Sequence, residues 1–314
     1  MKIIALFPIK NDRWILDTTI PQLKLFADEI LCLDGGSTDG TIETLRSYGV
    51  MVKDQDQSNL NYSSWRQELL DWGRERGGTH FIWLDSDEAF TTNLLSTFRD
   101  EVAKLKPGQK LVLRWLCLWK DPRMYREDAS VWGHLYKDFV FCDDGKAAFG
   151  NVRLHEGRTP GENNTETWVK LPTEKGAVLH YQFVPFERFQ VKQAYQRCRE
   201  LVIGNDPRRI NLRYAETLDT TEELCKDLPP EWIAGVGNLN NINITPPGWF
   251  FEGIFNYFKE KGISFFESVQ IWHIPELHEK FLRSIGREPR IKTYPKWIIK
   301  LNKIKNFLRE RLLK

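Results

Sequence analysis

The sequence contains few cysteines and no long apolar run. Its five cysteines are scattered and form no Cys-x-x-Cys pair, which argues against a disulfide framework or a cysteine zinc site and predicts a reducing compartment. No uncharged run is long enough to span a membrane, and residues 1–8 have too short an apolar core for a signal peptide. We therefore expect a cytoplasmic protein that contacts a membrane only from its surface.

An excess of one charge is also missing. Lys and Arg number 45 against 43 for Asp and Glu, so the overall charge does not indicate a nucleic-acid partner. A hydrophobic content of 41% and a charged content of 28% are typical of a soluble globular protein. A chain of 314 residues is expected to form one domain of ordinary size and a smaller second one.

The most informative stretch is the apolar run 81–84 and the acids that follow it. The run is typical of a strand buried in a parallel sheet, and it ends at Asp85, Asp87 and Glu88. Ligands bind at the carboxyl ends of such strands, and carboxylate oxygens suit Mg²⁺ or Mn²⁺, which hold substrate phosphates. An Asp-x-Asp pair alone is weak evidence, because residues 54–56 repeat it in a polar loop and Asp is also a common helix N-cap.

Apolar runs that predict buried strands alternate with helical patterns over residues 1–84, which indicates one doubly wound sheet with right-handed crossovers. The expected strands are 3–7, 29–33, 50–53 and 81–84, with helices around 14–26, 42–45 and 65–74. The loops after the first, second and fourth strands then meet at one edge. They bring together the polar residues of a candidate nucleotide pocket: Asn11, Asp12, Asp34, Asp39, Asp85 and Asp87. Taken alone, the Asp34 loop also fits an ordinary capped turn.

Several pieces of sequence resemble, in order and spacing, the family-two glycosyltransferases with a GT-A fold. The similarity is greatest to the bacterial branch that builds lipopolysaccharide core and other surface glycans. The pieces are Pro8-Ile9-Lys10-Asn11-Asp12, Asp34-Gly35-Gly36-Ser37-Thr38-Asp39-Gly40-Thr41, Arg66, Leu84-Asp85-Ser86-Asp87-Glu88, Leu154-His155-Glu156 and Leu179-His180-Tyr181. They cover roughly residues 1–200, and their joint occurrence makes the resemblance specific.

The resemblance implies a glycosyltransferase with a Rossmann-like GT-A domain, a nucleotide-sugar donor, Mn²⁺ or Mg²⁺ as cofactor, and a glycan or lipid-linked acceptor. It also implies inversion at the transferred sugar. The residues that it places on the nucleotide are Pro8, Asn11, Asp12, Asp34, Arg66 and Asp85, with Asp87 on the metal. The sequence departs from the family at Gly35, where a second acid is usual, and at Gln67, where an Asn is usual. The first departure leaves base recognition open.

The chemistry of sugar transfer points to the same residues. The departing phosphate carries two negative charges, which a divalent ion held by Asp87 and Asp85 would stabilise as a Lewis acid. A carboxylate takes the proton of the acceptor hydroxyl. Glu156 is the first candidate for this base and Glu88 the second, although position 156 is also compatible with a polar strand end. His180 ends an apolar strand and is a nitrogen ligand, a diphosphate contact or a structural histidine.

Three segments in the middle of the chain have competing interpretations. Asp143-Asp144-Gly145 lies between two short apolar runs, and we predict a hairpin turn there rather than a catalytic acid. The polar segment 157–167 is expected to be a mobile lid or an inert loop. Tryptophans within 115–132, together with Arg123 and Arg126, are either an acceptor wall or part of the core.

From residue 185 onward the strand pattern gives way to helices, so we expect a catalytic domain at 1–184 and a mainly helical region at 185–314. Residues 296–314 combine apolar side chains at helical spacing with many Lys and Arg. Such a basic amphipathic helix suits an anionic membrane surface, where it would hold the enzyme beside a lipid-linked acceptor. Basic C-terminal helices that do not touch lipid are also common.

Two other functions are compatible with this fold. A catalytically silent protein that binds a nucleotide or a glycan would keep the sheet, but the intact acids Asp85, Asp87 and Glu156 argue against it. A sugar-nucleotide pyrophosphorylase needs a glycine-rich phosphate loop after the first strand, and residues 8–13 contain no glycine. We therefore expect a glycosyltransferase that uses a nucleotide-sugar donor and has no nucleic-acid partner.

Overall fold

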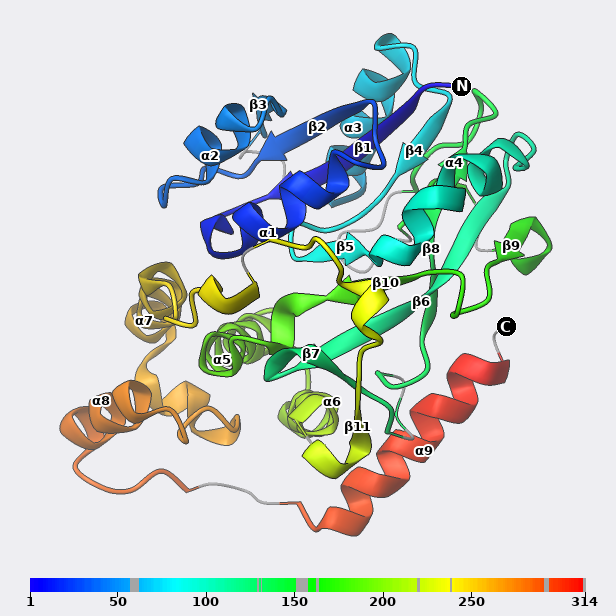
Figure 1. Ribbon diagram of the computed structural model, residues 1–314. Coiled ribbons are helices and arrows are strands. Elements are labelled where there is room, and N and C mark those ends of the chain that lie inside the picture. Colours follow the sequence, from blue (N-terminus) through cyan, green and yellow to red (C-terminus); the bar gives the residue numbers. More distant parts are fainter. Residues whose placement is uncertain are drawn as a thin grey trace.

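A computed structural model describes residues 1–56, 62–128, 130, 132–150, 158–161, 164–218, 221–237, 239–290 and 294–312. It shows an α/β protein in which one mixed sheet runs through the molecule and helices lie against it (Figure 1). This arrangement confirms the predicted Rossmann-like fold class. Further helices, from the C-terminal part of the chain, gather below the sheet in this view.

The N-terminal strands form the parallel part of the sheet, as predicted. They are β1 (Ile3–Ile9), β2 (Glu29–Asp34), β3 (Met51–Asp54) and β4 (His80–Ile82), and the helices between them are α1 (Arg13–Leu23), α2 (Thr41–Ser47) and α3 (Tyr62–Glu75). The strands pair in parallel in the order β4-β1-β2-β3. β4 ends two residues earlier than predicted, because the chain leaves the ladder after the Trp83 N–H donates to the Phe139 carbonyl at 2.8 Å.

The rest of the sheet is mostly antiparallel, and most of its strands are not apparent from the sequence pattern. They are β5 (Glu88–Phe90), β6 (Lys110–Trp119), β7 (Asp121–Arg126), β8 (Tyr136–Cys142), β9 (Trp168–Lys170), β10 (Ala177–His180) and β11 (Cys225–Asp227). The long strand β6 pairs antiparallel with β7 and β8 and parallel with β9 and β10. β8 then pairs with β4, which joins both parts into the order β11-β7-β6-β8-β4-β1-β2-β3.

The hairpin predicted around residues 143–145 forms only in part. The turn is present: Asp144 Oδ1 accepts hydrogen bonds from the N–H groups of Lys146 (2.9 Å) and Ala147 (2.8 Å), and Gly145 has a φ of +71°. The expected second strand at 147–149 is wrong, because these described residues form no strand. Instead, the Arg74 guanidinium holds this loop by donating to the Ala147 carbonyl at 2.8 Å.

The remaining helices are α4 (Leu95–Ala103), α5 (Phe186–Val202), α6 (Pro207–Leu218), α7 (Gly248–Lys261), α8 (Pro275–Ile285) and α9 (Lys296–Leu312). Short 3-10 turns lie at Thr92–Leu94, Thr165–Thr167, Tyr181–Phe183, Glu222–Leu224, Pro230–Trp232, Leu239–Asn241 and Ile263–Ser268. Helices α5 to α8 share a hydrophobic cluster of their own, centred on buried side chains such as Cys198, Ile254 and Phe281. No helix within the described part of the chain has the length and apolarity needed to cross a membrane.

The helical region also contributes to the sheet, since β11 pairs with β7. The division into residues 1–184 and 185–314 therefore stays a prediction. Helix α9 lies beside α6 at the edge of the molecule (Figure 1).

Candidate active site

A cavity of about 630 Å³ opens at the carboxyl ends of the parallel strands. Its walls come from the ends of β1 and β10, from the loops after β2 and β4, and from α5 and α7. Part of its lining was expected from the sequence: Pro8, Asp12, Asp85, Asp87 and His180. Strands that lie side by side thus bring residues distant in the sequence to one space.

Asn11 and Asp34 lie beneath this cavity rather than on its surface. Asn11 is buried with a left-handed φ of 55°, and its side-chain oxygen accepts a hydrogen bond from the Thr38 N–H at 2.7 Å. Asp34 Oδ2 accepts from the N–H groups of Gly36 (2.9 Å) and Ser37 (2.8 Å). The two side chains therefore fix the shape of the loops after β1 and β2.

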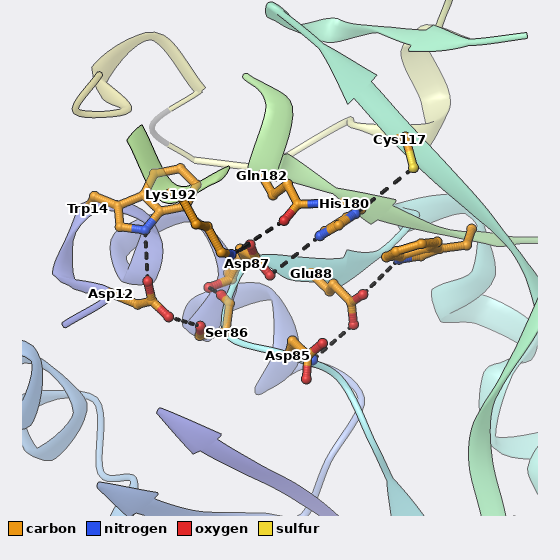
Figure 2. A network of polar contacts seen from close by, with 12 residues as sticks. Asp12, Trp14, Asp85, Ser86, Asp87, Glu88, Cys117, His180, Gln182 and Lys192 are labelled. Atoms are coloured by element: carbon orange, nitrogen blue, oxygen red, sulfur yellow. Dashed lines mark hydrogen bonds and ion pairs between the residues drawn. The ribbon is translucent and has the colours of Figure 1, made fainter. Parts of the chain in front are cut away.

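Asp12 joins three elements around the cavity (Figure 2). Its carboxylate accepts hydrogen bonds from the Ser86 hydroxyl at 2.7 Å and from the Trp14 indole N–H at 3.1 Å. The buried Arg188 of α5 donates to it at 3.1 Å. These contacts tie the loop after β1 to the loop after β4 and to the helical region.

Glu88 is buried, and both of its oxygens are engaged. Arg158 donates to them at 2.5 and 2.6 Å, the Trp115 indole donates at 2.7 Å, and the Asp85 N–H donates at 2.9 Å. Burial raises the pKa of Glu88, although the charge of Arg158 opposes this. The glutamate therefore holds Arg158, which lines the cavity.

Asp85 faces the cavity with its side chain 41% exposed and lies 3.2 Å from Arg158. Removal from water acts against its ionisation, but the positive charges of Arg158 and Arg66 outweigh this and hold the pKa of Asp85 below its usual value. Asp85 is thus a carboxylate at neutral pH.

Asp87 is buried and lies between His180 and Lys192 (Figure 2). The distances from its oxygens are 3.7 Å to His180 Nε2 and 4.0 Å to Lys192 Nζ. Burial, together with the neighbouring acids Asp12, Glu88 and Asp85, raises the pKa of Asp87 to about 7, while Lys192 opposes the rise. Three further acids therefore add negative charge around the buried Asp87 carboxyl group, beside the positive charge of Lys192.

His180 is stacked on Trp115, with ring centroids 4.3 Å apart and an interplanar angle of 19°. Its Nδ1 lies 4.0 Å from the sulfur of Cys117, and its Nε2 points to Asp87 (Figure 2). Burial and the nearby cations keep the pKa of His180 well below its usual value. A neutral imidazole that faces a carboxylate is a suitable metal ligand.

The predicted metal ligands are only partly brought together. Asp87 and His180 are neighbours, whereas Asp85 is turned to Arg158. Among the described residues, no three His, Cys, Asp or Glu side chains are arranged to hold an ion. Mg²⁺ in phosphate-binding sites takes one or two protein carboxylates and completes its shell with phosphate and water, and the pair Asp87 and His180 fits that arrangement.

One other predicted nucleotide contact, Arg66, does not line the cavity. Arg66 is buried on α3, with its guanidinium 5.8 Å from the ring centroid of Trp83 and 5.9 Å from that of Phe149. It acts on the site through its charge, as the lowered pKa of Asp85 indicates. Glu156, the first candidate for the base, lies outside the described residues.

Two cations that line the cavity, Arg158 and Lys137, were not predicted as site residues. Arg158 belongs to the segment expected to be a lid or an inert loop, yet Arg158 and Thr159 are buried against the sheet. The Lys137 ammonium lies 3.9 Å from the ring centroid of Trp115, and burial lowers its pKa to about 8. Nothing in the local sequence distinguishes these residues from surface cations.

Residues 6–150 match the model of the family described as glycosyl transferase family 2. The matched segment is slightly less than half of the chain and includes the parallel strands and the loop after β4. The match supports the family that the sequence motifs predict. It says nothing about the branch of that family.

No curated protein sequence matches this chain. Solved structures that match include glucosyl-3-phosphoglycerate synthase from Mycobacterium tuberculosis. Its complex with Mn²⁺, uridine-diphosphate-glucose and phosphoglyceric acid is 17% identical, has a TM-score of 0.29, and is matched over 37% of this chain and 44% of that chain. Its complex with Mg²⁺ and uridine diphosphate is 18% identical, with a TM-score of 0.27 and coverages of 37% and 43%. The chain thus spans less than half the length of these structures.

Proposed function

We propose that the protein is a metal-dependent glycosyltransferase that moves a sugar from a nucleoside-diphosphate sugar to an acceptor hydroxyl group. The observation that carries this proposal is the placement of Asp87. It is a buried carboxyl group that lines a cavity of about 630 Å³ and has a neutral imidazole, His180, at its side. A space of that size suits a small-molecule substrate, and the family match of residues 6–150 supports the same reaction class.

Asp87 and His180 are the residues that would hold Mn²⁺ or Mg²⁺. They fit a divalent cation because the acids Asp12, Asp85 and Glu88 add negative charge around the buried Asp87 carboxyl. An ion bound there supplies Lewis-acid stabilisation of the departing diphosphate.

In the proposed reaction, the acceptor oxygen forms a bond to the anomeric carbon while the bond from that carbon to the diphosphate oxygen breaks. The acceptor proton passes to a carboxylate. Lys192 and Lys137 line the same cavity and place positive charge where the diphosphate would gain negative charge. Inversion at the anomeric carbon is proposed from the family resemblance.

Glu156 remains the proposed base. Glu88 takes a different role in this proposal, since its oxygens already accept hydrogen bonds from Arg158, Trp115 and Asp85. It is a positioning residue that holds Arg158 beside the donor site. Pro8 and Asp12 line the cavity of about 630 Å³, which we call the donor cavity. Asn11 and Asp34 fix the loops beneath it, and the positive charge of Arg66 lowers the pKa of Asp85.

The donor can be identified by melting-temperature shifts with UDP-, GDP-, dTDP- and CMP-sugars, with and without Mn²⁺. Binding to the folded state raises the melting temperature by mass action. We expect one nucleotide sugar to raise it only when Mn²⁺ is present, and Asp87→Ala to abolish that shift. If a folded protein gives no shift with any donor, the transferase proposal fails in favour of a silent binding protein, which a glycan array would then identify.

We further propose that the enzyme works in surface-glycan synthesis on a glycan or lipid-linked acceptor, held at the membrane by α9. Three apolar side chains of this helix are exposed at spacings of four and three residues: Trp297 (62%), Leu301 (57%) and Ile304 (45%). Lysines at positions 296, 300 and 305 accompany them. Exposed apolar side chains with neighbouring lysines suit an anionic lipid surface.

Flotation with liposomes that contain an anionic phospholipid tests the membrane contact. The full chain is expected to float with these liposomes and to remain behind with neutral ones. The variant Trp297→Ser with Leu301→Ser should lose most of the flotation, whereas Leu25→Ser, which changes an exposed apolar residue outside α9, should not. Equal flotation of all three proteins would rule out α9 as the anchor.

A further inference from the structure

A second cavity, of about 490 Å³, adjoins the first. The two share four lining residues: Trp115, Lys137, Gln182 and Lys192. Helix α5 stands between them, because Tyr195 and Arg199 line the first cavity while Gln196 and Glu200 line the second. The far wall of the second cavity is formed by α6.

The second cavity is lined by aromatic rings and amide side chains. Trp132 and Tyr214, both partly exposed, are the aromatic walls open to a ligand, because the Trp115 ring is covered by His180 and Lys137 and Phe189 is buried. Aromatic faces pack against the C–H surfaces of sugar rings. Flat walls of this kind favour a saccharide over a flexible lipid chain.

Two amide side chains on these walls, Gln182 and Gln196, have hydrogen-bonding groups without a partner among the described residues. No hydrogen bond joins the Gln196 side chain to another residue in the part of the chain that the structure describes. Gln182 uses its oxygen to accept from Lys192 at 3.3 Å, which leaves its NH₂ group as a donor. Amide groups that both donate and accept suit sugar hydroxyls. The acidic and basic side chains farther along, Glu200 and Arg213, neutralise each other at 3.0 Å.

The junction between the cavities lies next to the proposed reaction centre. Lys192 reaches toward both Asp87, at 4.0 Å, and Gln182, at 3.3 Å (Figure 2). Within the described residues, no carboxylate lies within 4.0 Å of the Lys137 ammonium, which covers the Trp115 ring instead. A group that enters the junction from the second cavity therefore meets the donor site directly.

We propose that this second cavity, the acceptor cavity, binds a saccharide, with the reacting hydroxyl at the junction beside Lys192 and Gln182. This inference rests on the proposed glycosyl transfer and names its acceptor class. Trp132 and Gln196 are the residues through which the cavity selects a sugar. They line this cavity and not the first.

Saturation-transfer NMR tests the proposal without knowledge of the natural acceptor. The probes are methyl glycosides of glucose, galactose, mannose and N-acetylglucosamine, together with lactose and maltose. We expect at least one to receive saturation from the protein, equally with and without saturating UDP and Mn²⁺. Trp132→Ala and Gln196→Ala should each reduce the signal at least threefold, and Lys10→Ala, which changes only the first cavity, should not.

The outcomes separate this inference from the proposed function. Absence of saturation transfer to every probe, its displacement by UDP, or its insensitivity to both variants would overturn the acceptor cavity. Melting curves show whether Trp132→Ala is folded, and Gln196→Ala, at a partly exposed position, provides the test if it is not. A signal that depends on these residues, in a protein whose melting temperature is raised by none of the four nucleotide sugars with Mn²⁺, would contradict the transferase and leave a saccharide-binding site.

Discussion

The Arg158 guanidinium bridges two acids of the site: it lies 2.5 Å from Glu88 and 3.2 Å from Asp85. Arg158 and Glu88 are both buried. A charged pair in such a position is held by mutual attraction, and removal of one partner leaves the other without compensation. One side chain from a polar loop thus fixes the wall of the donor cavity.

Arg158→Leu is therefore expected to destabilise the protein by about 3–5 kcal/mol, the usual loss when one partner of a buried ion pair is removed. Urea unfolding measures the change. The double variant Arg158→Leu with Glu88→Gln should lose less stability than the sum of the losses of the two single variants, because the double variant leaves no isolated buried charge. Arg283→Leu, at a side chain 81% exposed, is the control, and a loss below about 1 kcal/mol for Arg158→Leu would contradict the prediction.

Asp87→Asn should weaken Mn²⁺ binding in the presence of UDP by about tenfold or more, and His180→Gln should have an effect in the same direction, as expected for groups at a metal. Electron paramagnetic resonance of free Mn²⁺ measures the affinity. Asp54→Asn is the matched control, because Asp54 begins the other Asp-x-Asp pair and is exposed at the end of β3. Equal losses of Mn²⁺ affinity in Asp54→Asn and Asp87→Asn would contradict the prediction that the second Asp-x-Asp pair, and not the first, binds the metal.

Glu29 stabilises the folded state through contacts with Arg76 and Lys2, which lower its pKa from 4.5 to about 2. A carboxyl group with a lowered folded-state pKa contributes stability above its unfolded value and loses that contribution as the pH falls toward 2. We expect Glu29→Gln to cost about 1 kcal/mol at pH 7, the upper range for a solvent-screened pair. The difference from wild type should shrink between pH 4.5 and pH 2 in urea unfolding, whereas Glu68→Gln, at an exposed position, should show no such trend.

Gly73→Ala should destabilise the protein by about 1–3 kcal/mol through overpacking. A Cβ at this position would lie 2.5 Å from the Phe81 ring, which is fully buried under α3. At Gly237 an added Cβ would meet nothing within 4 Å, so Gly237→Ala should stay within about 0.5 kcal/mol of wild type. Thermal or urea unfolding distinguishes the two, and equal stabilities would show that the Phe81 ring can move aside.

The strands β1, β2 and β4 were predictable because each contains a short apolar run that ends near turn residues, which is a local signal. In the rest of the sheet, the strands that end at Cys142 and His180 gave such a signal, but the pairing of the strands could not be predicted. β6 is itself an apolar run, but nothing within it indicates that it pairs with β8 and with β10, which lies much later in the chain. The Asp144 turn could be predicted, but its following strand could not, because the Arg74 contact holds residue 147 instead.

For the site, strand order places Asp12, Asp85, Asp87 and His180 around one space, since the aspartates follow strands of the sheet and His180 ends another. Whether a polar residue then faces the cavity or supports it depends on loop geometry. Asp34 turns into its own loop and accepts hydrogen bonds from backbone N–H groups. Arg158 reaches Glu88 across a long sequence distance, and neither arrangement follows from residue spacing.

Helix α5 belongs to the donor site and to the helical cluster at once. Arg188 and Lys192 reach Asp12 and Asp87, while Cys198 is buried in the core shared with α7 and α8. Recombination between related genes at residue 184 would therefore replace two contacts of the donor site together with the helical core. The two parts of this protein are expected to be inherited as one unit, and hybrids that join them from different relatives should regain function only when the partner helix restores both cations.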